Sequence, residues 1–255
     1  MKQKVVALLQ ARTDSSRLPK KVLKNILGKP MILHQLQRTL NSRYLDQLML
    51  VTSDEKSDDT LAQIVMDAGF KVFRGSKNDV LERFEHAVEY LGLNEYDIVV
   101  RLTGDCPLHD AAIIDESIEA FMDSRCDYLA NCVEPVYPDG LDVEVFSVKS
   151  LQRAYKNATL PSQREHVTPY IRESGLFNIC HLEKEPRYQH WRLTVDESKD
   201  FELIQNIYEH FGKTCFSFNE IVLYLQEKQN LLKINSDIKR NEGYIKSLKE
   251  DTNDN

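Results

Sequence analysis

Four cationic side chains crowd a short segment that directly follows the apolar run Val5–Leu9. The segment is also rich in Ser, Thr and Asp, and its cations are Arg12, Arg17, Lys20 and Lys21. A loop of this composition gathers fixed N–H donors, forked guanidinium groups and an ammonium point charge, which together suit a polyphosphate. A solvated basic loop is the alternative explanation for such a cluster taken alone.

Two further segments carry matching side chains. Arg101–Asp105 and Arg192–Asp196 share four of five residues and lie 91 positions apart. Because side chains alternate along a strand, each segment would present Arg, Thr and Asp on one face and bring the Asp to the edge of a sheet. Two carboxylates that converge there repel one another unless a cation lies between them, and Mg²⁺ binds one or two carboxylates plus substrate phosphates. A strand that simply ends in an Asp turn is the alternative for either segment.

The elements that would position these residues alternate between strands and helices in the first half of the chain. The expected strands are Val5–Gln10, Gln47–Ser53, Lys71–Phe73 and Tyr96–Leu102. The expected helices between them are Pro30–Leu40, Asp58–Ala68 and Asp79–Leu91. This alternation predicts an α/β, Rossmann-like fold with a mostly parallel sheet and helices on both faces. Ligands of such sheets bind outside the carboxyl ends of the strands.

The pattern changes after about residue 126. The later expected strands are Asp127–Cys132, Leu141–Phe146 and Phe177–Leu182, and the later expected helices are Val148–Asn157, Arg164–Glu173, Lys199–Phe211 and Asn219–Lys228. We interpret residues 1–228 as one domain in which a small α+β insertion, about 127–190, covers the substrate. Residues 229–255 form a polar C-terminal tail, whose last six residues are expected to be disordered.

Composition restricts the function further. The chain has 255 residues, 42% of them hydrophobic and 29% charged, and a net charge of −7. That charge argues against a protein that neutralises many nucleic-acid phosphates. The five cysteines include no Cys-x-x-Cys pair, no apolar run is long enough to span a membrane, and we expect a cytoplasmic protein with reduced thiols.

The cationic loop resembles the signature of the sugar-activating cytidylyltransferases, which reads Ala-Arg, a Ser-rich bend, Arg-Leu-Pro and then Gly-Lys. Ala11-Arg12, Ser16–Pro19 and Lys21 occupy the motif positions here. This family includes the synthetases of CMP-Kdo and CMP-sialic acids, and the chain is most similar to its spore coat polysaccharide biosynthesis protein F branch. Lys20 stands where many relatives have Gly, so it must either adopt a similar backbone bend or contribute its own charge.

The resemblance implies a fold of the nucleotide-diphospho-sugar transferase type and a Mg²⁺-dependent reaction. CMP would pass from CTP to a sugar acceptor, a 2-keto sugar acid of the Kdo or sialic acid type, with release of pyrophosphate, for cell-surface polysaccharide synthesis. Asp105 and Asp196 would bind the metal, and Arg12 and Lys21 would be catalytic with them. The family also implies a homodimer formed through residues 127–190.

Two sets of binding residues follow from the same resemblance. The expected nucleotide-binding residues are Leu9, Gln10, Ala11, Arg12, Arg17, Lys21, Thr52, Ser53, Arg74, Asp79, Arg83 and Gly104. The expected acceptor-binding residues are Asp142, Glu144, Glu165, His166 and Arg192. Asp79 is equally well explained as a helix cap, and Asp142 and Glu144 as the wet face of an edge strand.

Two other functions remain open at this point. A glycosyltransferase of similar build would use a nucleotide sugar rather than make one, but its usual Asp-x-Asp metal motif is absent from the chain. A non-catalytic nucleotide-binding or assembly subunit would keep the fold and lose turnover. Lys20 in place of Gly is the only sequence feature that favours this second alternative.

Overall fold

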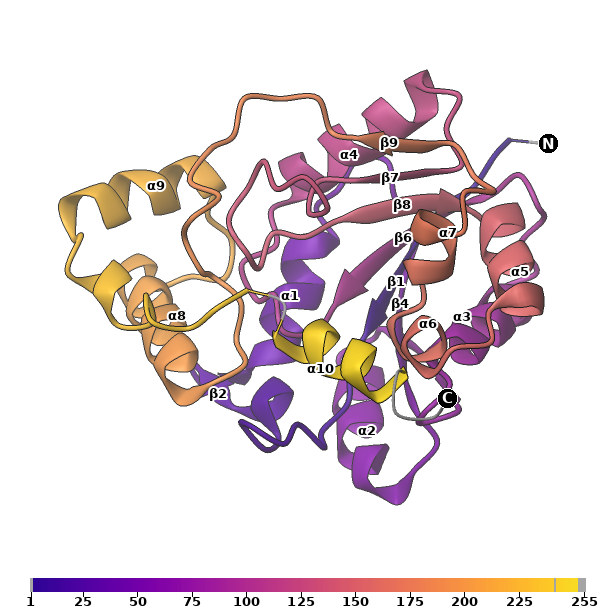
Figure 1. Ribbon diagram of the computed structural model, residues 1–255. Coiled ribbons are helices and arrows are strands. Elements are labelled where there is room, and N and C mark those ends of the chain that lie inside the picture. The colour runs from indigo at the N-terminus through magenta and orange to yellow at the C-terminus, as the bar shows by residue number, and fades with distance from the viewer. Residues whose placement is uncertain (1, 241, 252–255) are drawn as a thin grey trace.

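The computed structural model describes residues 2–240 and 242–251. Its centre is a seven-stranded sheet in the order β5-β4-β1-β6-β8-β7-β9 (Figure 1). The strands of this sheet are β1 (Val5–Gln10), β4 (Gln47–Ser53), β5 (Lys71–Gly75), β6 (Ile98–Thr103), β7 (Tyr128–Ala130), β8 (Glu144–Ser147) and β9 (Ile179–His181). A separate small hairpin pairs β2 (Asn25–Ile26) with β3 (Lys29–Pro30).

Strand β1 lies between β4 and β6 and is parallel to both. All but the last residue of β1 are buried, as expected for a central strand covered on both faces. Strands β5, β4, β1 and β6 are parallel, so their carboxyl ends meet at one edge of the sheet. The expected mostly parallel sheet is therefore confirmed.

Helices cover both faces of this sheet (Figure 1). Val5, Ala7 and Leu9 of β1 belong to one apolar cluster, and Val6 and Leu8 belong to the other. The first cluster is completed by α1 (Met31–Thr39), α2 (Asp59–Asp67), α4 (Ala111–Asp123), α8 (Ser198–Phe211) and α9 (Phe218–Glu227). The second is completed by α3 (Val80–Tyr90), α5 (Val148–Asn157) and α7 (Pro169–Glu173).

The sequence analysis missed two helices, α4 and the C-terminal α10 (Glu242–Asp251), and fused two others. Helix α4 was not expected, although its apolar residues recur at helical spacing and Asp110 caps it by accepting from the Ala112 N–H at 2.8 Å. The single helix expected over Arg164–Glu173 was wrong. The structure has α6 (Pro161–His166) and α7, separated at Val167, whose φ is +70°. Pro169 then begins α7, because proline lacks the N–H that a continuous helix would need there.

Residues 127–190 contribute β7, β8 and β9 to the main sheet. Strand β8 is antiparallel to β6 on one side and to β7 on the other, and it begins at Glu144, so Glu144 lies in an inner strand, Asp142 lies before it, and the edge-strand explanation is wrong for both. Among the described residues, no helix is both long and apolar enough to cross a membrane.

The C-terminal segment contains ordered structure. A short 3₁₀ turn spans Leu231–Lys233, and α10 (Glu242–Asp251) packs beside α6 (Figure 1). Of the six terminal residues expected to be disordered, the first two end α10 and residues 252–255 lie outside the described residues.

Gly140 permits the closest backbone contact near the site. Its φ is +101°, and a Cβ placed there would lie 2.4 Å from the Leu193 carbonyl carbon and from the Thr194 nitrogen. Beside it, the Asp139 carbonyl accepts from the Leu193 N–H at 2.7 Å. Only glycine combines this φ with this approach, so Gly140 fixes the segment that carries Asp196.

Gly140→Ala should therefore destabilise the protein by about 3 kcal/mol, since strain and overlap act together. Gly212→Ala is the matched control, because Gly212 also has positive φ, +60°, but nothing lies within 4 Å of the added carbon. We expect that control to cost only about 1 kcal/mol. Urea unfolding followed by circular dichroism measures both, and equal losses would contradict the close-approach argument.

Candidate active site

The segment after β1 is a closed loop held by a buried carboxylate. The Lys20 N–H donates to the Thr13 carbonyl at 2.9 Å. Thr13 donates its N–H and its hydroxyl to Asp58 Oδ1, at 2.8 and 2.7 Å. Burial disfavours the charged Asp58, but hydrogen bonds from Ser53 and Thr13 outweigh burial and lower its pKa. Asp58 therefore fixes the shape of the loop.

Lys20 adopts the left-handed conformation, with φ 55° and ψ 28°. This is the bend that a glycine would adopt without strain. Of the two options that the sequence left for Lys20, the backbone bend is the one present in the structure. Its side chain is exposed.

Lys21 lies at the centre of the site. Its Nζ is 3.2 Å from Asp105 Oδ2, 2.8 Å from Asp196 Oδ1 and 2.8 Å from the Val195 carbonyl oxygen. Burial alone would lower the pKa of Lys21, but the two carboxylates outweigh it and raise that pKa. Burial likewise opposes ionisation of Asp105, yet Lys21 brings the Asp105 pKa below its usual range.

Backbone contacts bring the two aspartates together. The Asp105 carbonyl accepts from the Val195 N–H at 2.8 Å and from the Thr194 hydroxyl at 3.1 Å. Asp105 follows β6, as the sequence predicted. The second copy of the motif is not a strand: an isolated bridge joins Asp139 to Arg192, and residues 193–196 belong to no strand.

Arg192 holds three carboxylates. Its Nε, Nη2 and Nη1 lie 2.9 Å from Asp200 Oδ1, 3.0 Å from Asp196 Oδ2 and 2.8 Å from Asp139 Oδ2. The carboxylates outweigh its burial and raise the pKa of Arg192 further. Arg192 therefore positions Asp196, and the acceptor contact expected of it stays a prediction.

Arg12 and Arg17 lie at the rim of the same site. Arg17 Nη2 is 3.1 Å from Asp196 Oδ2. Arg12 Nε is 3.1 Å from Asp14 Oδ1, and its Nη2 is 3.7 Å from Glu165 Oε1. The two side chains remain 39% and 35% exposed, so an anion can reach them from solvent.

The metal expected at Asp105 and Asp196 has a suitable but incomplete donor set. Both side chains offer the oxygen ligands that Mg²⁺ prefers, and Mg²⁺ commonly completes its shell with water and substrate phosphates. Within residues 2–240 and 242–251, no cluster of three or more His, Cys, Asp or Glu residues suits a metal ion. The two carboxylates fit a magnesium site that the substrate completes, and here the Lys21 ammonium bridges them.

Comparison with known proteins identifies the family of this arrangement. A family model for cytidylyltransferases matches residues 6–239. This chain belongs to the cytidylyltransferase family. Enzymes of this family transfer CMP from CTP, and the resemblance found in the cationic loop is confirmed. The match also favours a cytidylyltransferase over a glycosyltransferase.

Individual relatives extend over most of the chain. The uncharacterized protein MJ1063 of Methanocaldococcus jannaschii is 35% identical over 243 residues, covering 93% of this chain and 96% of the relative. The spore coat polysaccharide biosynthesis protein SpsF of Bacillus subtilis is 32% identical over 223 residues, covering 82% and 88%.

Solved structures agree with this assignment. A cytidylyltransferase from Leptospira borgpetersenii superposes with a TM-score of 0.85 at 30% identity, covering 91% of this chain and 97% of that one. A CMP:2-keto-3-deoxy-manno-octonic acid synthetase complexed with CTP superposes with a TM-score of 0.62 at 18% identity, covering 82% and 99%. The second likeness supports the fold alone.

The nucleotide-binding residues expected around β1 pack tightly. Leu9 is fully buried, and Gln10 Oε1 accepts from Arg101 Nε at 3.0 Å. The Gly104 N–H donates to the Gln10 carbonyl at 2.7 Å, and a Cβ on Gly104 would lie 2.6 Å from that of Ala11. Gly104 is thus required for the close approach of β1 and β6.

The residues expected on the neighbouring strands lie deeper or are already paired. Thr52 and Ser53 are buried, and the Ser53 hydroxyl donates to Asp58. Arg74 donates to the Ser53 and Glu55 carbonyls at 3.0 and 2.9 Å. Ser53 therefore supports the loop through Asp58, and the nucleotide contacts of all three residues stay predictions.

Asp79 and Arg83 flank the start of α3. Asp79 caps the helix by accepting from the Glu82 N–H at 2.8 Å, which confirms the cap, and it also pairs with Arg164, which the sequence analysis did not select. Arg83 is buried, and burial reinforced by the charge of Arg12 lowers its pKa to about 10. Its Nε has no hydrogen-bond partner among the described residues.

The expected acceptor residues occupy two environments. Glu144 is buried and accepts from Tyr128 Oη at 2.5 Å, from Thr168 Oγ1 at 2.6 Å and from Arg101. Asp142 Oδ1 instead lies 2.6 Å from Arg240 Nη2. Arg240 belongs to the segment read as a tail, and no local sequence signal connected it with Asp142.

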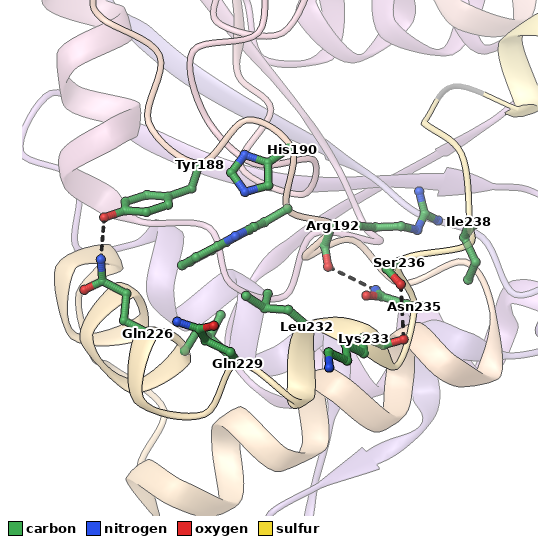
Figure 2. Close-up of a pocket in the computed structure, with 12 residues that line it drawn as sticks. Tyr188, His190, Arg192, Gln226, Gln229, Leu232, Lys233, Asn235, Ser236 and Ile238 are labelled. Carbon is green, nitrogen blue, oxygen red and sulfur yellow. Dashed lines mark hydrogen bonds between the residues drawn. The ribbon is translucent and has the colours of Figure 1, made fainter.

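A separate cavity of about 520 Å³ lies behind Arg192 (Figure 2). Tyr188 and Trp191 line it with their rings stacked 4.3 Å apart. Figure 2 shows the Arg192 carbonyl bonded to Asn235, which is buried and donates at 3.0 Å. This bond attaches the C-terminal segment to the residue that positions Asp196.

Buried His109 supplies a pH-dependent contact to the site. Its Nε2 lies 3.1 Å from the Asp142 carbonyl, and its Nδ1 lies 3.0 Å from Gln35 Nε2. These contacts fit a neutral ring that donates from Nε2 and accepts at Nδ1. Burial lowers the pKa of His109 from 6.5 to about 4.

Because the unfolded chain binds the extra proton first, His109 should cost stability as pH falls from 6.5 towards 4. Between pH 6.5 and 4 the free energy of unfolding of the wild type should decrease. In His109→Gln that decrease should be smaller by about 1–3 kcal/mol, because the ionisable ring is gone. Urea unfolding at several pH values measures this difference. His86→Gln, at an exposed position of α3, is the control and should follow the wild type. Identical slopes for wild type and His109→Gln would contradict the argument.

Proposed function

We propose that this cytidylyltransferase transfers CMP from CTP to a hydroxyl group of a sugar acid and releases pyrophosphate. The observation that carries the proposal is the convergence of Lys21, Asp105 and Asp196 beside two accessible arginines. Carboxylates and cations at the carboxyl edge of a parallel sheet suit a triphosphate with its metal. SpsF is named for spore coat polysaccharide biosynthesis, which supports a role in making cell-surface polysaccharide.

The chemistry needs positioning and charge neutralisation rather than a covalent enzyme intermediate. The acceptor oxygen forms a bond to the α-phosphorus as the bond from that phosphorus to the pyrophosphate oxygen breaks. Arg12, Arg17 and Lys21 bind the phosphates and stabilise the departing pyrophosphate. The acceptor hydroxyl loses its proton, and no residue is assigned as the base.

Magnesium remains part of the proposal. Asp105 and Asp196 would hold it, and when bound it would neutralise phosphate charge and lower the pKa of the acceptor hydroxyl. Lys21 would then exchange its carboxylate partners for phosphate oxygens. Its raised pKa keeps the ammonium charged for that contact.

A 2-keto sugar acid is the acceptor class that the relatives support. A 3-deoxy-manno-octulosonate cytidylyltransferase of Francisella tularensis is 28% identical over 219 residues, covering 78% of this chain and 83% of the relative. We place the reaction in the cytoplasm, where CTP is made. A non-catalytic subunit would bind CTP and release no pyrophosphate.

Replacing either aspartate should abolish turnover. We expect Asp105→Asn and Asp196→Asn each to reduce pyrophosphate release by about 100-fold or more, since each removes charge that faces the triphosphate. The assay supplies CTP, UTP, GTP or ATP with Mg²⁺ and a panel of 2-keto sugar acids and sugar phosphates. Asp237→Asn is the control, because Asp237 is exposed and pairs only with Lys199 at 2.7 Å among the described contacts. Wild-type activity in both aspartate variants would refute the proposed site.

We also propose a homodimer formed through residues 127–190. Strand β9 is an edge strand of the sheet, and Val133, Leu160 and Leu176 in this region are exposed. Light scattering at micromolar concentration should give twice the mass of one chain. A monomer at that concentration would refute the dimer.

A further inference from the structure

The described residues 235–240 and 242–247, here called the C-terminal strap, lie against the expected acceptor residues. The strap contacts four of the five residues expected to bind the acceptor. Arg240 contacts Asp142, and Ser247 contacts both Glu165 and His166. Arg192 is contacted twice, by the Asn235 side chain and by the Lys239 carbonyl. The strap is therefore built into the acceptor side of the site.

Anchors hold the strap at both ends. At its start, buried Asn235 donates to the Arg192 carbonyl at 3.0 Å (Figure 2). It also donates to Asp200 Oδ1 at 2.8 Å. Beyond its end, Asp251 Oδ1 accepts from the Ser162 N–H of α6 at 2.9 Å. Arg240 lies between these anchors, so its backbone is restrained near the site.

Arg240 carries donors that the protein does not satisfy. Its Nη2 is paired with Asp142, but its Nε and Nη1 are buried and have no hydrogen-bond partner among the described residues. The Nε lies 3.9 Å from Asp139 Oδ1, which is too far for a hydrogen bond. Buried guanidinium donors without partners are costly, and charged acceptor oxygens are their strongest partners.

The position of these donors indicates which chemical group of the substrates they would bind. Asp142, the partner of Arg240, is separated by only one residue, Leu141, from Gly140, which packs on the backbone of Leu193 and Thr194. Arg240 therefore pairs with a residue expected to bind the acceptor, whereas the cations expected to bind the triphosphate, Arg12, Arg17 and Lys21, belong to the loop after β1. A guanidinium there suits a carboxylate on the sugar rather than a phosphate of CTP.

We propose that Arg240 is a specificity-determining residue that binds the carboxylate of the acceptor sugar acid, oriented for this contact by Asp142. This inference rests on the proposed function and adds a residue from outside the expected domain, 1–228. The strap makes recognition of the acid a property of the C-terminal segment. A purely structural Arg240 would only join the strap to Asp142.

The test compares full-length wild type with Arg240→Gln and Arg240→Lys, first with the acceptor varied at saturating CTP and then with CTP varied at saturating acceptor. The probes are 3-deoxy-manno-octulosonate, N-acetylneuraminate and the carboxamide of whichever acid wild type uses. Arg240→Gln should raise KM for the acid about 10- to 100-fold and leave KM for CTP unchanged. Arg240→Lys should recover part of the loss, and KM for the neutral carboxamide should not change. Lys239→Gln, an exposed neighbour in the strap, should behave as wild type.

Equal increases in KM for the acid and the carboxamide would overturn the inference and leave Arg240 a structural residue. If wild type releases no pyrophosphate with either acid, the proposed function fails for them, and saturation-transfer NMR then measures binding of the acids alone. Saturation transfer from wild type to the acid that is lost with Arg240→Gln would support the inference even without turnover. Saturation transfer that persists with the variant, or that is absent with wild type, would overturn the inference.

Discussion

The ammonium group of Lys21 is the contact on which the rest of the site depends. Two carboxylates that share a partner at 3.2 and 2.8 Å repel one another strongly when no cation separates them. Like charges 4 Å apart in a protein interior of effective dielectric about 20 cost about 4 kcal/mol. Asp105 and Asp196 can converge because Lys21 compensates that repulsion, with Arg17 and Arg192 adding charge at Asp196. A metal and a triphosphate would bring both signs of charge, so the same carboxylates and cations can separate and pair anew when substrate binds.

The fold provides this convergence through backbone contacts at the carboxyl edge of the sheet. β1 and β6 approach closely because position 104 is glycine, and the segment bearing Asp196 lies against the turn at Gly140. The Asp105 carbonyl then bonds directly to that segment. The loop and Asp105 follow parallel strands, whereas Asp196 lies in a segment that belongs to no strand. The ends of parallel strands thus position Lys21 and Asp105, and a segment held by backbone contacts positions Asp196.

Much of this arrangement could be predicted from local patterns. β1, β4 and α5 have the expected limits, because apolar periodicity and capping act over a few residues. The repeated segment also predicted that Asp105 and Asp196 meet, although Asp196 does not follow a strand and the contact of Lys21 with both aspartates was not predicted. The supporting roles of Asp58 and Arg240 could not be predicted in this way. Both act through contacts with residues far away in sequence, and no pattern in the neighbouring residues indicates those contacts. The polar composition that suggested a tail conceals α10, whose partners are mainly polar side chains on α6 and α7.

The strap leaves the ribosome after the other residues expected to form the site. Domains tend to fold from the N-terminus during synthesis. Lys21, Asp105 and Asp196 all precede the strap, so a nascent chain can assemble its triphosphate side while the acceptor side still lacks its cover. Under the proposed role of Arg240, recognition of nucleotide and of sugar would then mature in sequence. Substitution of the Arg240 side chain would alter the choice of sugar, whereas loss of Asn235 would also release Arg192, which positions Asp196.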